Sequence, residues 1–263
     1  MDRITKAIEM ANKRRVDVQA GRNSTAVLDF AGLETIQVHE QTLEASKVVA
    51  GVLSNPVSEY YRVLRTKLLR LMTQNGWKVI GVTGPDSSSG KSLTATNLSV
   101  AIAMEPNHSA LLIDADLRKP ALGKLFNVEP KKGLSEMLSG KAKLSEVFYS
   151  IGIPRHAVLF NTRQQFGSSD LLMGKPVKSL IDEVKANEDG VVAIFDLPPV
   201  FVGDDAIAMS ALLDAVVVVV DAGRTTKQQL QATLELLKDA NIAGCVLNNA
   251  PDSDCIAQQY SYY

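Results

Sequence analysis

The chain has 263 residues, of which 46% are hydrophobic and 22% charged, and this composition excludes collagen-like, fibrous and fully disordered proteins. Its longest unbroken apolar run, residues 215–220, is far too short for a membrane-spanning helix, and its first residues lack the apolar core of a secretory signal, so we expect a cytoplasmic protein. The net charge of −1 and the absence of a basic block predict no nucleic-acid partner.

The first 76 residues predict helices and a linker. Apolar side chains recur at helical spacing in residues 3–15, which indicates a short amphipathic helix in segment 1–15. Segment 16–40 lacks periodicity, and we expect a linker whose composition allows disorder. Helical character returns in segment 41–76, interrupted at Asn55-Pro56 because proline disfavours helix at the residue before it.

Beyond residue 77, short β-branched runs alternate with helical segments. The runs are residues 79–83, 110–114, 157–160, 191–196, 215–221 and 242–247. Continuously apolar runs are typical of strands buried on both faces of a parallel sheet. Residues 77–250 are therefore predicted to form an α/β domain, a doubly wound and mostly parallel sheet with the helical segments as an N-terminal extension. Residues 251–263 would form a C-terminal tail.

The strongest chemical signal follows the first of these strands. It reads Gly84-Pro85-Asp86-Ser87-Ser88-Ser89-Gly90-Lys91-Ser92, and it runs into a predicted helix at residues 93–104. Such a turn lets the backbone amides of Ser87, Ser88, Ser89 and Gly90 converge on phosphate, with Lys91 reaching the β/γ-phosphates and Ser92 binding Mg²⁺. The pattern predicts a P-loop NTPase domain. One departure is that Pro85 occupies the place of the pattern's first glycine.

Carboxylates end two further strands. The run 110–114 continues as Asp114-Ala115-Asp116-Leu117-Arg118, and the run 191–196 ends in Asp196 before two prolines. Ligands of open α/β sheets bind at this edge, so Asp114, Asp116 and Asp196 are candidates for holding Mg²⁺ and orienting a hydroxyl. A solvated turn is the alternative for the first pair. Asp204-Asp205 is expected to cap a helix, and Arg118 either binds phosphate or is surface charge.

These three motifs, in this order, resemble the bacterial tyrosine kinases of exopolysaccharide systems, which derive from the deviant Walker ATPases. The likeness covers about residues 50–263 and is greatest to stand-alone cytoplasmic kinases that pair with a separate membrane protein. It implies an ATP- and Mg²⁺-dependent protein-tyrosine autokinase. Lys91 would stabilise the transferring phosphate, Ser92, Asp116 and Asp196 would hold Mg²⁺, Asp114 would orient the tyrosine hydroxyl, and Asn248 would contact adenine.

The resemblance also implies partners. Glu59, Arg62 and Arg65 lie three residues apart on a predicted helix and correspond to the family's ring-forming motif, although an ordinary charged helix face is the alternative. Tyr260, Tyr262 and Tyr263 in the tail would be phosphoacceptors in a neighbouring subunit, or else a docking peptide or packing residues. A transmembrane polysaccharide co-polymerase at the inner membrane would be the partner through which the chain acts on polysaccharide chain length and export.

Two other functions remain open on this scaffold. A partitioning or positioning switch ATPase would carry a lysine at the second position of the loop octet, where this chain has Asp86. A non-catalytic nucleotide-binding adaptor is compatible with Pro85, because proline supplies no N–H to phosphate.

Overall fold

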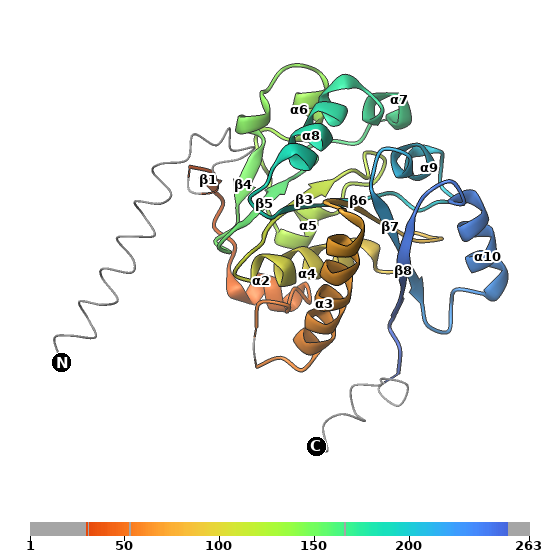
Figure 1. Cartoon of the computed structure of the whole chain (residues 1–263). Coiled ribbons are helices and arrows are strands. Elements are labelled where there is room, and N and C mark those ends of the chain that lie inside the picture. The colour runs from red at the N-terminus through yellow and green to blue at the C-terminus, as the bar shows by residue number, and fades with distance from the viewer. Residues whose placement is uncertain (1–29, 31, 53, 166, 252–263) are drawn as a thin grey trace.

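Every strand that the structure describes lies in one sheet, whose order is β1-β4-β5-β3-β6-β2-β7-β8 (Figure 1). The structure is a computed structural model that describes residues 30, 32–52, 54–165 and 167–251. The strands are β1 (Glu34–Thr35), β2 (Val79–Thr83), β3 (Ser109–Asp114), β4 (Phe148–Ser150), β5 (His156–Leu159), β6 (Val191–Asp196), β7 (Ala215–Asp221) and β8 (Ile242–Asn248). Only the β4–β5 pair is antiparallel among these. The predicted doubly wound, mostly parallel sheet is confirmed.

All six predicted strands are present, with ends shifted by one residue at most. The central strands β2, β6 and β7 are buried along their whole length, which explains why their sequences are continuously apolar. Two strands were not predicted. The strand β1 lies within the segment expected to be a linker, and β4 pairs antiparallel with β5. Strands of two and three residues are too short to carry a periodic signal.

Helices cover both faces of the sheet (Figure 1). They are α2 (Glu40–Ala45), α3 (Val57–Asn75), α4 (Lys91–Ala103), α5 (Leu122–Phe126), α6 (Leu134–Leu138), α7 (Ser168–Leu172), α8 (Lys175–Ala186), α9 (Asp205–Ser210), α10 (Lys227–Leu236) and the 3₁₀ helix η1 (Leu144–Glu146). One core contains side chains of α3 and α4, and a second contains those of α8 and α9. Helix α4 is almost entirely buried because it packs against both the sheet and α3.

The predicted helical segment 41–76 contains most of α2 and all of α3, and the break between them includes Asn55-Pro56. Helix α3 ends at Gly76, whose φ of 70° is a left-handed conformation that glycine adopts at low cost. The amphipathic helix predicted in residues 1–15 and nearly all of the tail lie outside the described residues. Within the described part, no helix combines the length and apolarity needed to cross a bilayer.

The sheet order determines which loops meet. Strand β2 lies between β6 and β7, and β3 lies on the other side of β6. Since these strands are parallel, their carboxyl ends share one edge, and the segments after β2, β3 and β6 come together there. This edge is where the sequence places the phosphate loop and the three carboxylates.

Candidate active site

The loop between β2 and α4 contains two glycines, Gly84 and Gly90, at which any side chain would collide with neighbouring atoms. A Cβ on Gly84 would lie 2.5 Å from both the Ser89 hydroxyl oxygen and the Val219 carbonyl oxygen. A Cβ on Gly90 would lie 2.1 Å from Asn248 Nδ2, and Gly90 has a φ of 82°. The close backbone approach that the motif pattern assigns to the position of Pro85 is therefore made one residue earlier, at Gly84.

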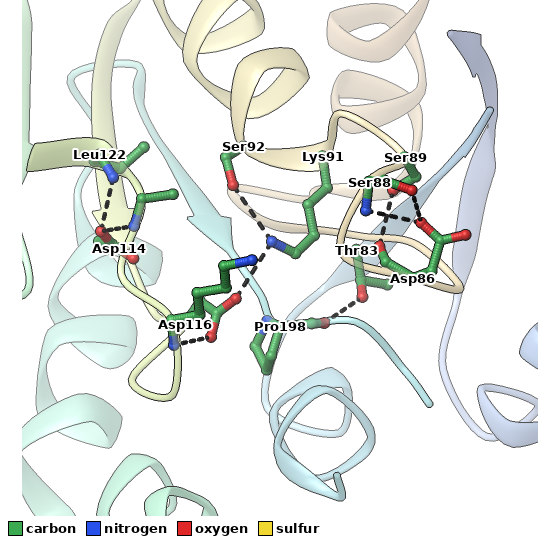
Figure 2. A network of polar contacts seen from close by, with 12 residues as sticks. Thr83, Asp86, Ser88, Ser89, Lys91, Ser92, Asp114, Asp116, Leu122 and Pro198 are labelled. Atoms are coloured by element: carbon green, nitrogen blue, oxygen red, sulfur yellow. Dashed lines mark hydrogen bonds and ion pairs between the residues drawn. The ribbon is translucent and has the colours of Figure 1, made fainter. Parts of the chain in front are cut away.

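Side chains fix the interior of this loop. The Asp86 carboxylate accepts hydrogen bonds from the Ser88 amide at 2.8 Å and the Ser88 hydroxyl at 2.9 Å (Figure 2). From the end of β8, Asn248 Nδ2 donates to the Ser89 carbonyl at 3.0 Å. Asn248 thus tethers the phosphate loop, while its predicted contact with adenine remains a prediction.

Lys91 begins α4 with its side chain turned toward the carboxylates. The residue is 4% exposed, and its Nζ lies 3.3 Å from Asp116 Oδ2 and 3.3 Å from the Ser92 hydroxyl (Figure 2). Burial lowers the pKa of Lys91, but the charges of Asp196 and Asp116 more than offset this and the pKa is raised above its ordinary value. Lys91 is therefore a protonated cation at neutral pH, as phosphate binding requires.

Asp114 and Asp196 are register partners at the ends of β3 and β6, and both are fully buried. Burial raises the pKa of Asp196 to about 6, although the charge of Lys91 opposes the shift. Burial, with the charge of Asp196 added, raises the pKa of Asp114 well above its ordinary value. Both oxygens of Asp196 and Oδ1 of Asp114 have no hydrogen-bond partner among the described residues. Unpartnered buried carboxylate oxygens are costly unless a cation or a donor meets them.

The residues of this edge fit a magnesium ion bound together with nucleotide. Asp116, Asp196 and the Ser92 hydroxyl supply hard oxygen ligands, and Mg²⁺ in proteins takes one or two carboxylates and completes its shell with phosphate and water. Among the described residues, no three His, Cys, Asp or Glu side chains are grouped as an all-protein metal site. The set therefore suits Mg²⁺ shared with phosphate.

Asp114, the last residue of β3, and Asp116, two residues later, point in different directions (Figure 2). Asp116 contacts Lys91, whereas Asp114 Oδ2 accepts the amides of Ala121 at 3.1 Å and Leu122 at 3.0 Å at the start of α5. The structure thus brings Asp116 into direct contact with the phosphate loop and ties Asp114 to α5. A cavity of 370 Å³ opens over this site, lined by Ser46, Ser87, Lys91, Ser92, Asp116, Lys119, Pro120, Ala121, Lys124 and Leu125.

One expectation near the site is correct only in part: helix α9 begins at Asp205 as expected, but the predicted capping by a carboxylate is wrong. Asp204 makes no capping hydrogen bond at α9. Asp205 instead accepts a hydrogen bond from Arg118 Nε at 2.6 Å and another from the Ser168 hydroxyl. Thr83 at the end of β2 donates to the Pro198 carbonyl at 2.7 Å (Figure 2). These partners are distant in sequence, and no local pattern predicts that they pair.

The proposed ring-forming residues are all on α3. Arg62 Nε donates to Glu59 at 2.9 Å within the helix, and Arg65 donates to the Ala101 carbonyl of α4 at 3.1 Å. Glu59 and Arg62 are thus available at the surface, while Arg65 holds α3 against α4. The tail tyrosines Tyr260, Tyr262 and Tyr263 lie outside the described residues.

Comparisons with known proteins match this architecture. Residues 80–263 match the CobQ/CobB/MinD/ParA nucleotide binding domain. The tyrosine-protein kinase YwqD of Bacillus subtilis is 32% identical over 208 residues, a region that covers 78% of this chain and 86% of that protein. The tyrosine-protein kinase ptk of Acinetobacter johnsonii is 30% identical over 73% of this chain, but the chain spans only 26% of the length of ptk.

A solved structure extends the likeness to three dimensions. The kinase domain of the Escherichia coli tyrosine kinase ETK superposes with a TM-score of 0.72 at 27% identity, and the match covers 86% of this chain and 93% of that domain. The similarity therefore extends over most of this chain and nearly all of that domain.

Proposed function

The chain belongs to the family of bacterial tyrosine-protein kinases, and we propose that it is an ATP- and Mg²⁺-dependent autokinase that phosphorylates tail tyrosines of a neighbouring subunit. The observation that carries this proposal is the contact between Lys91 of the phosphate loop and Asp116, beside the buried Asp114 and Asp196. A cation surrounded by carboxylates at the carboxyl edge of a parallel sheet suits phosphoryl transfer, which depends on positioning and charge stabilisation.

Each residue of the site has a separate role in the proposed phosphoryl transfer. The amides from Ser87 to Gly90 and the Lys91 ammonium bind the phosphates and stabilise charge on the transferring group. Ser92, Asp116 and Asp196 would hold a magnesium ion, which would further neutralise the charge of the phosphates. Asp114 orients the acceptor hydroxyl and takes its proton.

The same proposal includes a ring of subunits that assembles through α3. Its surface carries Glu59 and Arg62 together with exposed apolar side chains, since Val57 and Val63 are 46% and 45% exposed. Exposed apolar residues beside a pair of opposite charges suit a self-association surface. We further propose, on the family relationship, that the chain acts at the inner membrane face through a transmembrane polysaccharide co-polymerase that it regulates.

The direct test is intact-mass spectrometry of the purified protein incubated with Mg-ATP, with mapping of each added phosphate. We expect phosphate on Tyr260, Tyr262 or Tyr263, no phosphate on the Lys91→Met variant, and wild-type phosphorylation of Lys178→Met, an exposed lysine of α8. Release of inorganic phosphate without transfer to tyrosine would contradict the proposal in favour of a switch ATPase. ATP binding without either reaction would favour an adaptor.

A further inference from the structure

The loop that follows α2 forms part of the wall of the active-site cavity. Ser46, which comes directly after α2, lines this cavity together with Lys91, Ser92 and Asp116. Helix α2 lies in the segment that precedes the α/β domain, and it packs against α5 (Figure 1). The site therefore includes a residue from outside the α/β domain. We call residues 46–50 the α2 loop.

Asn97 holds the α2 loop against α4, the helix that begins at the phosphate loop, and Asn97 is fully buried there. Its Oδ1 accepts the amides of Val49 at 2.8 Å and Ala50 at 2.9 Å. Its Nδ2 donates to the carbonyls of Lys47 at 3.0 Å and Leu93 at 3.1 Å. These bonds use the two acceptor and two donor positions of the side-chain amide. The α2 loop is thus fixed relative to the phosphate-loop helix.

The backbone of the α2 loop adopts a conformation that needs this support. Lys47 has a φ of 59°, in the left-handed region that residues with a Cβ adopt only at a cost. The next residues, Val48 to Ala50, are buried in the core, so the turn at Lys47 leads from the end of α2 into the protein interior. Backbone strain that the surroundings hold in place is a feature of binding sites. The clamp and the turn together keep Ser46 at the cavity.

Ser46 brings a free hydroxyl to this cavity. The residue is half-buried, and its hydroxyl has no hydrogen-bond partner among the described residues. A serine hydroxyl can donate one hydrogen bond, and an anionic oxygen is its strongest acceptor. The hydroxyl is therefore available to a ligand.

The charges around Ser46 suit a phosphate group. The cavity lining contains Lys91, Lys119 and Lys124, and its single carboxylate, Asp116, contacts Lys91. Lys124 shares the adjoining cavity with Glu129. No further carboxylate lines either cavity, so the charge of Lys119 is not balanced within the lining. A lysine in this position favours an anionic ligand.

The position of the cavity selects the terminal phosphate of a nucleotide. The described lining residues come from the phosphate loop, the segment after β3, α5 and the α2 loop, and none belongs to β7 or β8. The proposed contact of Asn248 with adenine places the base on the β8 side. A triphosphate bound along the phosphate loop therefore directs the phosphate farthest from the base toward this cavity.

We propose that the Ser46 hydroxyl donates a hydrogen bond to the terminal phosphate of bound ATP, and that Asn97 is the positioning residue that holds Ser46 in place. The proposal rests on the proposed function, because it takes the phosphate loop as an ATP site. It gives the segment before the α/β domain a means to distinguish a nucleoside triphosphate from a diphosphate, which lacks the phosphate that Ser46 would contact.

The test is a calorimetric titration of the full-length protein, in the presence of Mg²⁺, with ADP and with AMP-PNP, an ATP analogue that is not hydrolysed. Ser46→Ala should weaken the binding of AMP-PNP about tenfold, as expected for a hydrogen bond to a charged group, and leave the binding of ADP unchanged. Ser54→Ala is the matched control, because Ser54 is exposed and lies outside the cavity lining. An unchanged affinity of Ser46→Ala for AMP-PNP, or an equal loss for both nucleotides, would overturn the proposal.

Asn97→Ala tests the positioning role. This variant should weaken the binding of AMP-PNP more than that of ADP, and adding Ser46→Ala should cause little further loss, because the two residues act through one contact. If Asn97 were only structural, Asn97→Ala would lower the resistance to urea and leave the ratio of the two affinities unchanged. If Asn97→Ala does not fold, the comparison of Ser46→Ala with wild type decides the proposal.

Phosphate transfer, measured on the same samples with ATP, separates this proposal from the kinase assignment. A selective loss of AMP-PNP binding in Ser46→Ala, with no transfer to tyrosine by wild type, would contradict the kinase assignment alone. Transfer by wild type together with a normal affinity of Ser46→Ala for AMP-PNP would contradict the role of Ser46 alone. Unchanged nucleotide binding with a raised KM for a tyrosine peptide would place Ser46 at the acceptor and overturn the proposal. No binding of either nucleotide by wild type would overturn both.

Discussion

Arg118 and Asp205 form an ion pair that joins the segment after β3 to the segment after β6. Arg118 Nε donates to Asp205 Oδ2 at 2.6 Å, and Asp205 is 1% exposed with its other oxygen bound to the Ser168 hydroxyl. Gly203 leaves room for the guanidinium, since a Cβ there would lie 2.6 Å from Arg118 Nη2. Arg118 stands two residues after Asp116, so the pair anchors the turn that directs Asp116 toward Lys91.

Removing the Arg118–Asp205 ion pair should lower the phosphorylation rate without preventing nucleotide binding. In Arg118→Gln the turn loses its charged tie, and we expect a higher Mg²⁺ requirement and a phosphorylation rate reduced on the order of ten- to hundredfold, the usual effect of residues that orient metal ligands. Arg118→Lys should recover part of the rate. Phosphorylation measured across a Mg²⁺ titration, beside nucleotide binding, checks this. An unchanged Mg²⁺ dependence together with lowered urea resistance would show that the pair is structural only.

Gly90→Ala should damage the phosphate loop more than its backbone conformation alone explains. The new Cβ would meet Asn248 Nδ2 at 2.1 Å in a residue whose φ is 82°. Gly140 is the matched control, because its φ is 70° and a Cβ there would have nothing within 4 Å. Gly140→Ala should therefore cost only about 1 kcal/mol of left-handed strain and leave nucleotide binding intact.

Combining Gly90→Ala with Asn248→Ala separates the two causes. The second substitution removes the clashing amide, so the double variant should be more stable than Gly90→Ala alone if the collision dominates. Urea denaturation and titration with a fluorescent ATP analogue measure the two effects. Equal stability losses for Gly90→Ala and Gly140→Ala would show that the contact with Asn248 is unimportant.

The buried imidazole of His156 makes stability depend on pH. Burial lowers the pKa of His156 to about 3, and its Nε2 contacts the Ser99 hydroxyl at 2.9 Å. The unfolded chain takes up this proton near pH 6.5, so the stability that the neutral ring provides is complete above pH 6.5 and is lost as the pH falls toward 3. At pH 5 this linkage should lower the free energy of unfolding by about 2 kcal/mol relative to neutral pH.

Urea denaturation at pH 7 and pH 5 tests the linkage by difference. His156→Gln should lose that part of the pH dependence whatever its own stability, whereas replacement of the exposed His39 by Gln should retain it. If wild type and His156→Gln lose the same stability between the two pH values, His156 is not the responsible group.

Local patterns predicted the parts of this protein that local chemistry determines. The positions of the six longer strands could be predicted because burial on both faces imposes continuous apolar runs. The three aspartates could be identified as candidates because each ends or follows such a run. The ties that shape the site were not readable: Arg118 and Asp205 are 87 residues apart, and Asn248 and Ser89 are 159 apart. Pairing over such separations depends on strand order, which periodicity does not encode.

The three charged residues of α3 should separate by experiment into two roles. Arg65 donates to the Ala101 carbonyl of α4, so Arg65→Ala should lower the free energy of unfolding by about 1 kcal/mol, the usual value of one such bond. Glu59 and Arg62 pair with each other at the surface, so Glu59→Ala/Arg62→Ala should change stability by less than about 0.5 kcal/mol. If α3 forms the subunit interface, this double variant should nevertheless abolish association.

Light scattering over a range of concentrations measures the association of subunits, and urea denaturation of the same samples measures the free energy of unfolding. A double variant that still associates like wild type would exclude Glu59 and Arg62 from the interface.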